Sequence, residues 1–319
     1  QSVSTFAGNP YFIDLEELIK KELLTKEECE ACDWGGSESY VDYEKIYLSR
    51  YKLLRKAYEK ADLKTDPDYA EFLKEEKDWL QDYCLFMAIK NDQKGICWID
   101  WPEELKDRHS KAVKEAEKEL AEEIEFYRFQ QYCFTTQWRK LKAYANKKDI
   151  SIIGDVPIYV ALDSSDAWAN PEMLQFDEDY NPKAVAGCPP DAFSATGQLW
   201  GNPLYDWKAL KKDGYGWWVQ RMTHCLELYD VVRIDHFRGF DEYYAIPYGD
   251  KTAERGKWEK GPGMDLFHTL DKKIKDLRVI AEDLGFLTES VLEMLKESGY
   301  PGMKVLQFAF DGSEDSSYL

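Results

Sequence analysis

The chain has 319 residues, which suffice for one large α/β domain or two smaller ones, and α/β barrels of this length commonly form a single domain. Its 42 basic and 61 acidic residues leave a formal net charge of −19, which repels nucleic acid and anionic membranes and excludes both as expected partners. Aromatic residues make up 15% of the chain, and their flat rings suit sugar faces as well as protein cores.

The cysteines and the N-terminal residues indicate a cytoplasmic protein. The seven cysteines are an odd number, scattered through a chain that is too large to need disulfide bonds. The chain starts without the basic segment and apolar run of a secretion signal, and no apolar run approaches the ~18 residues of a membrane span. Cys29-x-x-Cys32 has no second pair at zinc spacing, so neither a metal site nor a redox role is expected there.

The first 149 residues are predicted to be mainly helical. Apolar and aromatic residues recur every three or four positions, with charged residues on the opposite face. The expected elements are a short strand at 11–13 and helices at 15–24, 43–90 and 102–147. No linker or repeat divides the chain, so we expect an early barrel segment at 1–42 and an inserted helical subdomain at 43–149.

From residue 150 onward, short apolar runs alternate with helical segments. They predict strands at 150–160, 231–237, 279–284 and 303–310, separated by helices at 216–228, 266–276 and 289–297. This alternation implies right-handed βαβ crossovers and a parallel sheet, so residues 150–319 are expected to form a barrel core. The first three strands end near Asp155, Asp235 and Glu282, and in a parallel barrel such ends converge on one mouth.

The strand at 231–237 carries two charges on one face. Because side chains alternate along a strand, Val232 and Ile234 point to one side, and Arg233 and Asp235 point to the other, which we expect to be an otherwise buried face. Burial of charge is costly unless the charges are paired or used. This face therefore indicates either a functional site or a structural ion pair in the core.

Asp235 and Glu282 are the candidate catalytic pair. Cleavage of a glycosidic bond needs one acid that protonates the leaving oxygen and one carboxylate that stabilises or captures the oxocarbenium-like carbon. Arg233 favours the ionised form of Asp235 and so a nucleophilic role, whereas the apolar run before Glu282 is expected to raise its pKa, which suits a general acid/base. A magnesium site with Asp235 and His236 as ligands is the alternative; since no further ligand cluster is visible, no metal is expected.

A long segment at 185–205, between the first two predicted strands, is rich in Gly, Pro, Asn and aromatic residues. Long ordered loops at such a position are often functional. We expect Trp200 and Tyr205 to stack on sugar rings, and Asp191, Gln198 and Asn202 to form hydrogen bonds with sugar hydroxyls. A loop that only packs over the barrel edge is the alternative.

Several long motifs follow one another along the chain. They are Ser4-Thr-Phe-Ala-Gly-Asn-Pro10, Gln137-Trp-Arg139, Gly154-Asp-Val-Pro-Ile-Tyr159, the loop at 189–205, Arg233-Ile-Asp-His-Phe-Arg-Gly239 and Ala281-Glu-Asp-Leu-Gly285. Together they resemble the 4-alpha-glucanotransferase family, also known as amylomaltase or disproportionating enzyme. The resemblance covers essentially the whole chain.

The resemblance implies a (β/α)8 TIM barrel with helical insertions, which acts on α-1,4-glucans and maltooligosaccharides by retaining double displacement and needs no cofactor. Asp235 would be the nucleophile and Glu282 the acid/base, while Arg233, His236 and Asp155 would hold the sugar ring in the donor subsite. The loop at 190–205 would embrace the glucan, and a sugar 4-hydroxyl would accept the chain in place of water. Retention predicts carboxyl groups about 5–5.5 Å apart.

The sequence departs from the family in one respect. The family's third essential carboxylate, an aspartate on a later strand, has no counterpart before Leu319, and we expect the first barrel strand and the last two to be absent as well. We therefore expect an internal fragment of a longer enzyme, with exposed strand edges, that is unstable or inactive by itself. Hydrolysis of the same bonds, or glucan binding without turnover, are the alternative functions.

Overall fold

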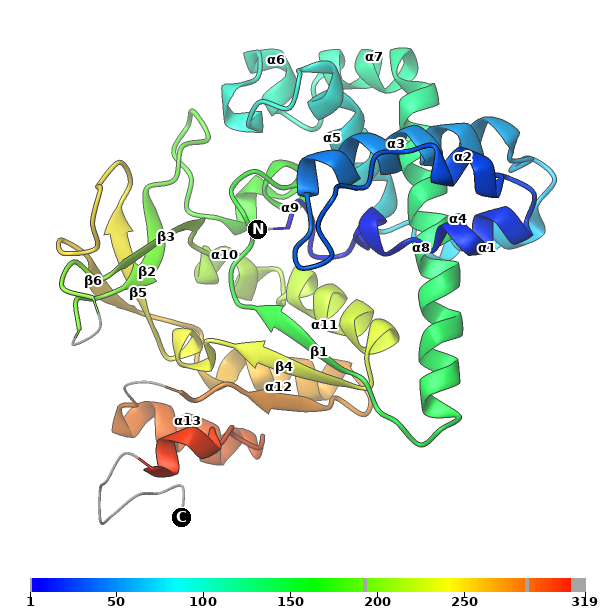
Figure 1. Ribbon diagram of the computed structural model, residues 1–319. Coiled ribbons are helices and arrows are strands. Elements are labelled where there is room, and N and C mark those ends of the chain that lie inside the picture. Colours follow the sequence, from blue (N-terminus) through cyan, green and yellow to red (C-terminus); the bar gives the residue numbers. More distant parts are fainter. Residues whose placement is uncertain (1, 192–193, 285–286, 311–319) are drawn as a thin grey trace. The chain divides into compact units, whose positions relative to one another are not determined.

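The computed structural model describes residues 2–191, 194–284 and 287–310 and has a mixed α/β fold (Figure 1). The chain divides into two compact units, one formed by Phe6–Tyr144 and the other by Gln1–Thr5 together with Ala145–Leu319. The first unit is helical, and the second contains every strand of the described residues. The helical unit already includes residues 6–42, and the expected division at 43–149 stays a prediction.

Five helices of the first unit begin where a short polar side chain caps them. Asp14, Thr25, Asp42, Asp66 and Ser110 each accept a backbone N–H from the first turn of the helix that follows. The helices are α1 (Leu15–Lys20), α2 (Lys26–Glu30), α3 (Tyr43–Lys60), α4 (Pro67–Glu75), α5 (Leu80–Asp92), η2 (Trp98–Asp100), α6 (Glu103–Lys106), α7 (Lys111–Glu119) and α8 (Ala121–Asn146). The long helical runs predicted from periodicity are therefore divided by caps and turns.

The segment before α1 is a 3₁₀-helix, η1 (Pro10–Phe12), so the strand predicted at 11–13 is wrong. The side chain of Asn9 accepts an N–H of this turn, and the proline at its first position fixes φ near the helical value. Just before it, Gly8 exchanges two hydrogen bonds with the side-chain amide of Gln131, at 2.7 and 2.9 Å. A Cβ at Gly8 would lie 1.9 Å from the ring of Phe134, so only glycine allows this close approach to α8.

One hydrophobic cluster of the helical unit is formed by residues of α1, α3 and α8 and of the segments beside them. Leu18, Leu53 and Phe129 are almost completely buried in it. The ring of Tyr58 on α3 lies against Phe126 and Phe129 of α8, with ring centroids 5.6 and 5.8 Å away. Burial of these apolar faces, more than helix propensity, stabilises the helices.

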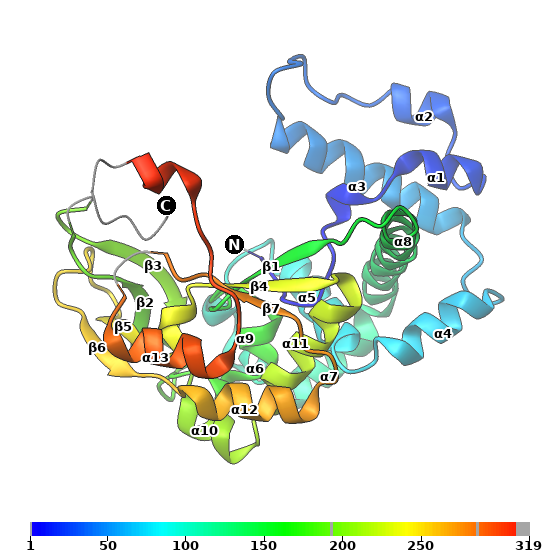
Figure 2. The ribbon, with the colours of Figure 1, turned by 90° about the horizontal axis from the view of Figure 1, so that it is seen from below.

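The second unit contains a parallel sheet in which β1 (Ile153–Pro157), β4 (Val231–Asp235) and β7 (Val279–Ala281) lie in the order β1-β4-β7. The first three predicted strands are confirmed, although each is shorter than expected. Figure 2 shows α11 (Gly216–Leu228) and α12 (Met264–Lys273) along one face of this sheet, and α13 (Glu289–Ser298) follows β7. The three helices predicted for this region are confirmed. Among the described residues these strands do not close into a barrel.

An antiparallel sheet occupies much of the segment that was predicted to be a loop at 185–205. Its strands β3 (Gln198–Pro203), β2 (Ala184–Cys188), β5 (Glu242–Pro247) and β6 (Lys257–Lys260) lie in that order. Gly187 permits the pairing of β2 with β3, because a Cβ there would lie 2.1 Å from the carbonyl oxygen of Gln198. The remaining elements are α9 (Ser165–Ala169), η3 (Pro171–Met173), α10 (Trp207–Lys212) and η4 (Phe237–Phe240).

The strand predicted at 303–310 is wrong. The backbone N–H of Met303 donates to the Asp283 carboxylate at 2.6 Å, and η5 (Leu306–Phe310) is a 3₁₀-helix. The carbonyl of Pro301 accepts the N–H of Ala281 at 2.9 Å. These two bonds hold the segment against the end of β7 without a strand ladder.

A buried arginine supports the chain directly after β1. Arg221 of α11 is 2% exposed, and its guanidinium donates to the carbonyls of Pro157 and Ile158. It also lies over the ring of Trp218, 4.9 Å from the ring centroid. Arg221 therefore fixes the carboxyl end of β1, the strand that carries Asp155.

We expect Arg221→Met to destabilise the protein by about 3 kcal/mol, because it removes a buried donor and leaves buried carbonyls with fewer partners. Arg255→Met is the matched control, since the Arg255 side chain is 75% exposed, although the side chain of its partner Asp250 is 10% exposed; its expected cost is smaller, about 1 kcal/mol. Urea unfolding followed by circular dichroism measures both changes. Equal losses of unfolding free energy in the two variants would contradict the inference that Arg221 fixes the carboxyl end of β1.

Candidate active site

Two of the three predicted carboxylates lie at the carboxyl ends of neighbouring parallel strands, and the third, Asp155, lies two residues before the end of its strand. Asp155 lies in β1 and pairs in register with Arg233, Asp235 is the last residue of β4, and Glu282 directly follows β7. The ladder continues at this edge, because the N–H of Glu282 donates to the carbonyl of Ile234 at 3.0 Å. Residues far apart in the sequence thus meet at one edge of the sheet.

Arg233 joins two of these carboxylates. Its Nη1 donates to Asp155 and lies 3.1 Å from Oδ1 of Asp235. Partial burial disfavours the charge, but the two carboxylates outweigh it and raise the pKa of Arg233. The arginine therefore remains a cation beside the candidate nucleophile.

The charged face of β4 is open rather than buried, which corrects the expectation from the sequence. The Asp155 and Asp235 side chains are 62% and 44% exposed, whereas Val232 and Ile234 on the opposite face are fully buried. The alternation of side chains was predicted correctly, but α11 and α12 cover only the apolar face. A ligand can therefore reach Asp235, and a structural ion pair inside a core does not describe this arrangement.

Glu282 is fixed by two backbone donors. Its Oε2 accepts the N–H of His236 at 2.9 Å, and its Oε1 accepts the N–H of Leu284 at 2.7 Å. His236 reaches this position in the left-handed region, with φ 60° and ψ 51°, a conformation that costs a non-glycine residue about 1–2 kcal/mol. The strained turn after Asp235 thus orients the carboxyl group on the neighbouring strand.

The ring of His236 packs against Trp200, with centroids 4.9 Å apart and the planes nearly perpendicular. Burial lowers the pKa of His236 to about 4, and the positive charge of Arg238 adds to the shift. The imidazole is therefore neutral at pH 7. A neutral ring can donate one hydrogen bond and accept another.

We expect His236→Asn to flatten the pH dependence of stability between pH 4 and 6.5. In this window the unfolded chain, whose histidine has its ordinary pKa near 6.5, binds more protons than the folded one, so the free energy of unfolding falls as the pH falls. The titration of His236 changes the free energy of unfolding by at most about 3 kcal/mol over this window. Asparagine tolerates the left-handed backbone, and His268→Asn, at a side chain that is 62% exposed, is the control. Parent and His236→Asn denaturation curves that shift equally from pH 7 to 4.5 would contradict this expectation.

The candidate residues of the 185–205 segment have different environments. Trp200 is partly buried beside His236, and its Nε1 donates to Oε1 of the exposed Gln198 at 3.0 Å. Asp191 is exposed and accepts the N–H of Ser194 at 2.7 Å. Residues 192–193 of this loop lie outside the described residues. Trp200 is thus the residue of this group that the fold brings to the strand ends.

Tyr205 and Asn202 instead bind the main chain that follows β1. The Tyr205 hydroxyl donates to the carbonyl of Ile158 at 2.8 Å, and the Asn202 amide donates to the carbonyl of Val160 at 2.7 Å. The ring of Tyr205 is 1% exposed among tryptophans, so the expectation that it stacks on sugar is wrong in this structure. An aromatic residue in a predicted binding loop cannot be told from a core aromatic by sequence alone.

Sequence reasoning missed Met303. Its Sδ accepts the Nε–H of Arg233 at 3.0 Å, which places a thioether beside the charged cluster. The sequence instead predicted that Met303 begins a strand at 303–310, which gave no indication of a contact with Arg233.

Two further properties of the described residues bear on the chemistry. Within residues 2–191, 194–284 and 287–310, no three His, Cys, Asp or Glu side chains are placed to hold a metal ion together. In the same part of the chain, no helix combines the length and the hydrophobicity that crossing a membrane requires.

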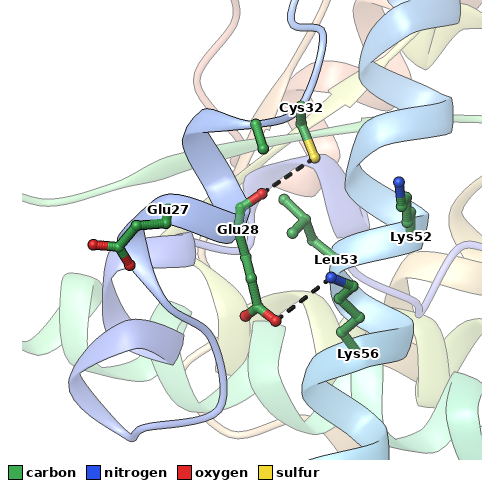
Figure 3. Close-up of a pocket in the computed structure, with 7 residues that line it drawn as sticks. Glu27, Glu28, Cys32, Lys52, Leu53 and Lys56 are labelled. Carbon is green, nitrogen blue, oxygen red and sulfur yellow. Dashed lines mark hydrogen bonds and ion pairs between the residues drawn. The ribbon is translucent and has the colours of Figure 1, made fainter.

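A cavity of about 280 Å³ in the helical unit is lined by residues of α2 and α3 (Figure 3). Two of its charged groups, Glu28 and Lys56, are paired at 3.5 Å, and the thiol of Cys32 donates to the carbonyl of Glu28 at 3.5 Å. None of the predicted site residues lines this cavity. It offers a mixed-charge surface.

Comparison with known proteins finds matches along the whole chain. A family model described as 4-alpha-glucanotransferase matches residues 1–319. The chain is 51% identical over 320 residues to a 4-alpha-glucanotransferase of Clostridium butyricum, an alignment that covers 100% of this chain and 66% of that protein. It is 45% identical over 323 residues to a 4-alpha-glucanotransferase of Thermus thermophilus, covering 100% of this chain and 64% of the other.

Solved structures agree. An amylomaltase from Streptococcus agalactiae in complex with acarbose superposes with a TM-score of 0.95 at 38% identity, covering 100% of this chain and 65% of that one. An amylomaltase from Corynebacterium glutamicum matches with a TM-score of 0.76 at 18% identity over 98% of this chain and 43% of its own, which shows likeness of fold alone. The chain spans slightly less than two thirds of the length of the curated relatives compared here.

Proposed function

We propose, because this chain belongs to the 4-alpha-glucanotransferase family, that it transfers α-1,4-glucan segments between maltooligosaccharides by retaining double displacement. The observation that carries the proposal is the cluster at the strand ends. Arg233 binds Asp155 and Asp235, and Glu282 is held on the neighbouring strand by two N–H groups. Asp235 at the end of β4 and Glu282 directly after β7 would then be the two carboxylates that a retaining glycosidase needs.

In the proposed reaction, a carboxylate oxygen of Asp235 attacks the anomeric carbon while Glu282 donates a proton to the departing sugar oxygen. The glycosidic bond breaks and a covalent glycosyl ester forms. Glu282, now a carboxylate, takes the proton from the 4-hydroxyl of an acceptor sugar, whose oxygen displaces Asp235 and restores the α-linkage. No external reagent is consumed.

The surrounding residues are assigned to substrate binding. Asp155, Arg233 and His236 would hold the donor ring, and Trp200 and Gln198 would contact the glucan beside it. We place Asn202 behind this contact surface, because its amide already binds the main chain after β1. The relative from Streptococcus agalactiae was solved with acarbose, which makes acarbose a suitable probe of this site. We also propose that β1, β4 and β7 belong to a (β/α)8 barrel.

Hydrolysis is the second candidate function. The observation in its favour is that the Asp235 side chain is 44% exposed, so water can reach the glycosyl ester. Chromatography of products after incubation with maltotriose separates the possibilities. Longer oligosaccharides together with glucose indicate transfer, whereas glucose and maltose alone indicate hydrolysis. Binding of acarbose without any product, both in this chain and in a C-terminally extended one, would contradict the enzymatic proposal.

A further inference from the structure

We propose that Met303 is a positioning residue for the transfer reaction: its thioether holds Arg233 so that the guanidinium faces Asp155 and Asp235. The proposal rests on the function proposed above. It adds to the cluster a residue that has no charge and no catalytic chemistry of its own.

The hydrogen bonds of Arg233 define the arrangement. Nη1 donates to Asp155 and forms an ion pair with Asp235, and Nε donates to Sδ of Met303 at 3.0 Å. A guanidinium is planar, so bonds at Nε and at Nη1 together fix the orientation of its plane. Without the bond at Nε, the plane can rotate about the side-chain torsions.

The chemistry of the acceptor suits this role. A thioether sulfur is a weak, uncharged acceptor. A carboxylate at the same place would compete with Asp235 for the positive charge, whereas methionine orients the cation and leaves its charge for the nucleophile. A side chain with three rotatable bonds orients little unless its own backbone is held firmly.

Two hydrogen bonds and one close approach hold that backbone. The N–H of Met303 donates to Oδ1 of Asp283 at 2.6 Å, and the carbonyl of Pro301 accepts the N–H of Ala281 at 2.9 Å. Between them, a Cβ at Gly302 would lie 2.4 Å from Oδ2 of Asp283, so the turn needs glycine for this approach. Asp283 follows Glu282 directly, so one short segment after β7 carries the acid/base and also anchors the residue that orients Arg233.

The test compares Met303→Leu, which keeps the volume and removes the sulfur acceptor, with Met303→Gln, which offers a carbonyl oxygen in its place. Met294→Leu, at a buried methionine of α13, is the matched control. We expect Met303→Leu to lower kcat/KM for maltotriose disproportionation about tenfold, Met303→Gln to recover most of it, and Met294→Leu to stay within about twofold of the parent. Melting temperatures of the two leucine variants should agree.

A second readout does not depend on turnover. The Nε–Hε NMR resonance of Arg233, assigned by its loss in Arg233→Lys, should shift in Met303→Leu and stay in place in Met294→Leu. Unchanged kcat/KM in Met303→Leu, a Met303→Gln variant as slow as Met303→Leu, or an unmoved resonance would each overturn the proposal. A parent that neither transfers nor binds glucan would instead overturn the proposed function, and the resonance would still decide whether Met303 holds Arg233.

Discussion

Asp235→Asn is expected to lower glucan transfer by at least about 10⁴-fold while glucan binding is retained. The amide has the size of the carboxyl group and can still accept a hydrogen bond from Arg233, but it is a very poor nucleophile and carries no charge to balance the oxocarbenium-like carbon. Glucose release from maltotriose measures the loss, and calorimetric titration with acarbose measures binding.

Asp155→Asn is the informative comparison, because Asp155 binds the same guanidinium and is the more exposed of the two carboxylates. As a binding residue it should lose only about 10–100-fold, expressed in part as a higher KM. Comparable losses in the two variants would contradict the assignment of Asp235 as the nucleophile. A pure glucan-binding protein would show no turnover to lose in either variant.

Sequence reasoning located the strand ends well because it relied on alternation and on the order of elements. The period-two pattern of β4 identified which residues lie on the face of Asp235, and α11 has the predicted bounds Gly216–Leu228. The spacing of apolar residues depends only on the geometry of the helix or strand itself, so it predicts correctly which side chains share a face. The alternation of strands and helices also predicted the parallel sheet, whose strands β1, β4 and β7 carry or directly precede Asp155, Asp235 and Glu282.

The errors arose where tertiary contacts override local signals. Gly187 and its neighbours read as a loop, but the same glycine allows β2 and β3 to pair closely. Tyr205 was predicted to stack on a sugar ring, but its hydroxyl donates to the carbonyl of Ile158 and accepts a hydrogen bond from Arg221. Met303 was predicted to begin a strand, but its N–H donates to the Asp283 carboxylate instead of to a neighbouring strand. In each case the deciding partner lies far away in the sequence.

Glu282→Gln is expected to lower transfer from maltotriose by about 10³-fold or more, yet to react with α-maltosyl fluoride. A sugar oxygen must be protonated as it leaves, whereas fluoride leaves without a proton. Asp235 can therefore still displace fluoride and form the glycosyl ester. The next step needs a base to accept the proton of the acceptor hydroxyl, and glutamine cannot supply one, so the ester should accumulate.

Mass spectrometry of the intact protein should then show the addition of one maltosyl group in Glu282→Gln, and peptide mapping should place it on Asp235. The double variant with Asp235→Asn should remain unlabelled, which separates an ester on Asp235 from non-specific attachment. Rapid cleavage of maltotriose by Glu282→Gln would mean that another group supplies the proton, and a label on a different residue would move the nucleophile away from β4. One of the two backbone N–H groups that bind Glu282 can still bind the carbonyl oxygen of glutamine, whereas the amide NH2 cannot accept the other, so the substitution removes proton transfer and keeps one of the two bonds that place the side chain.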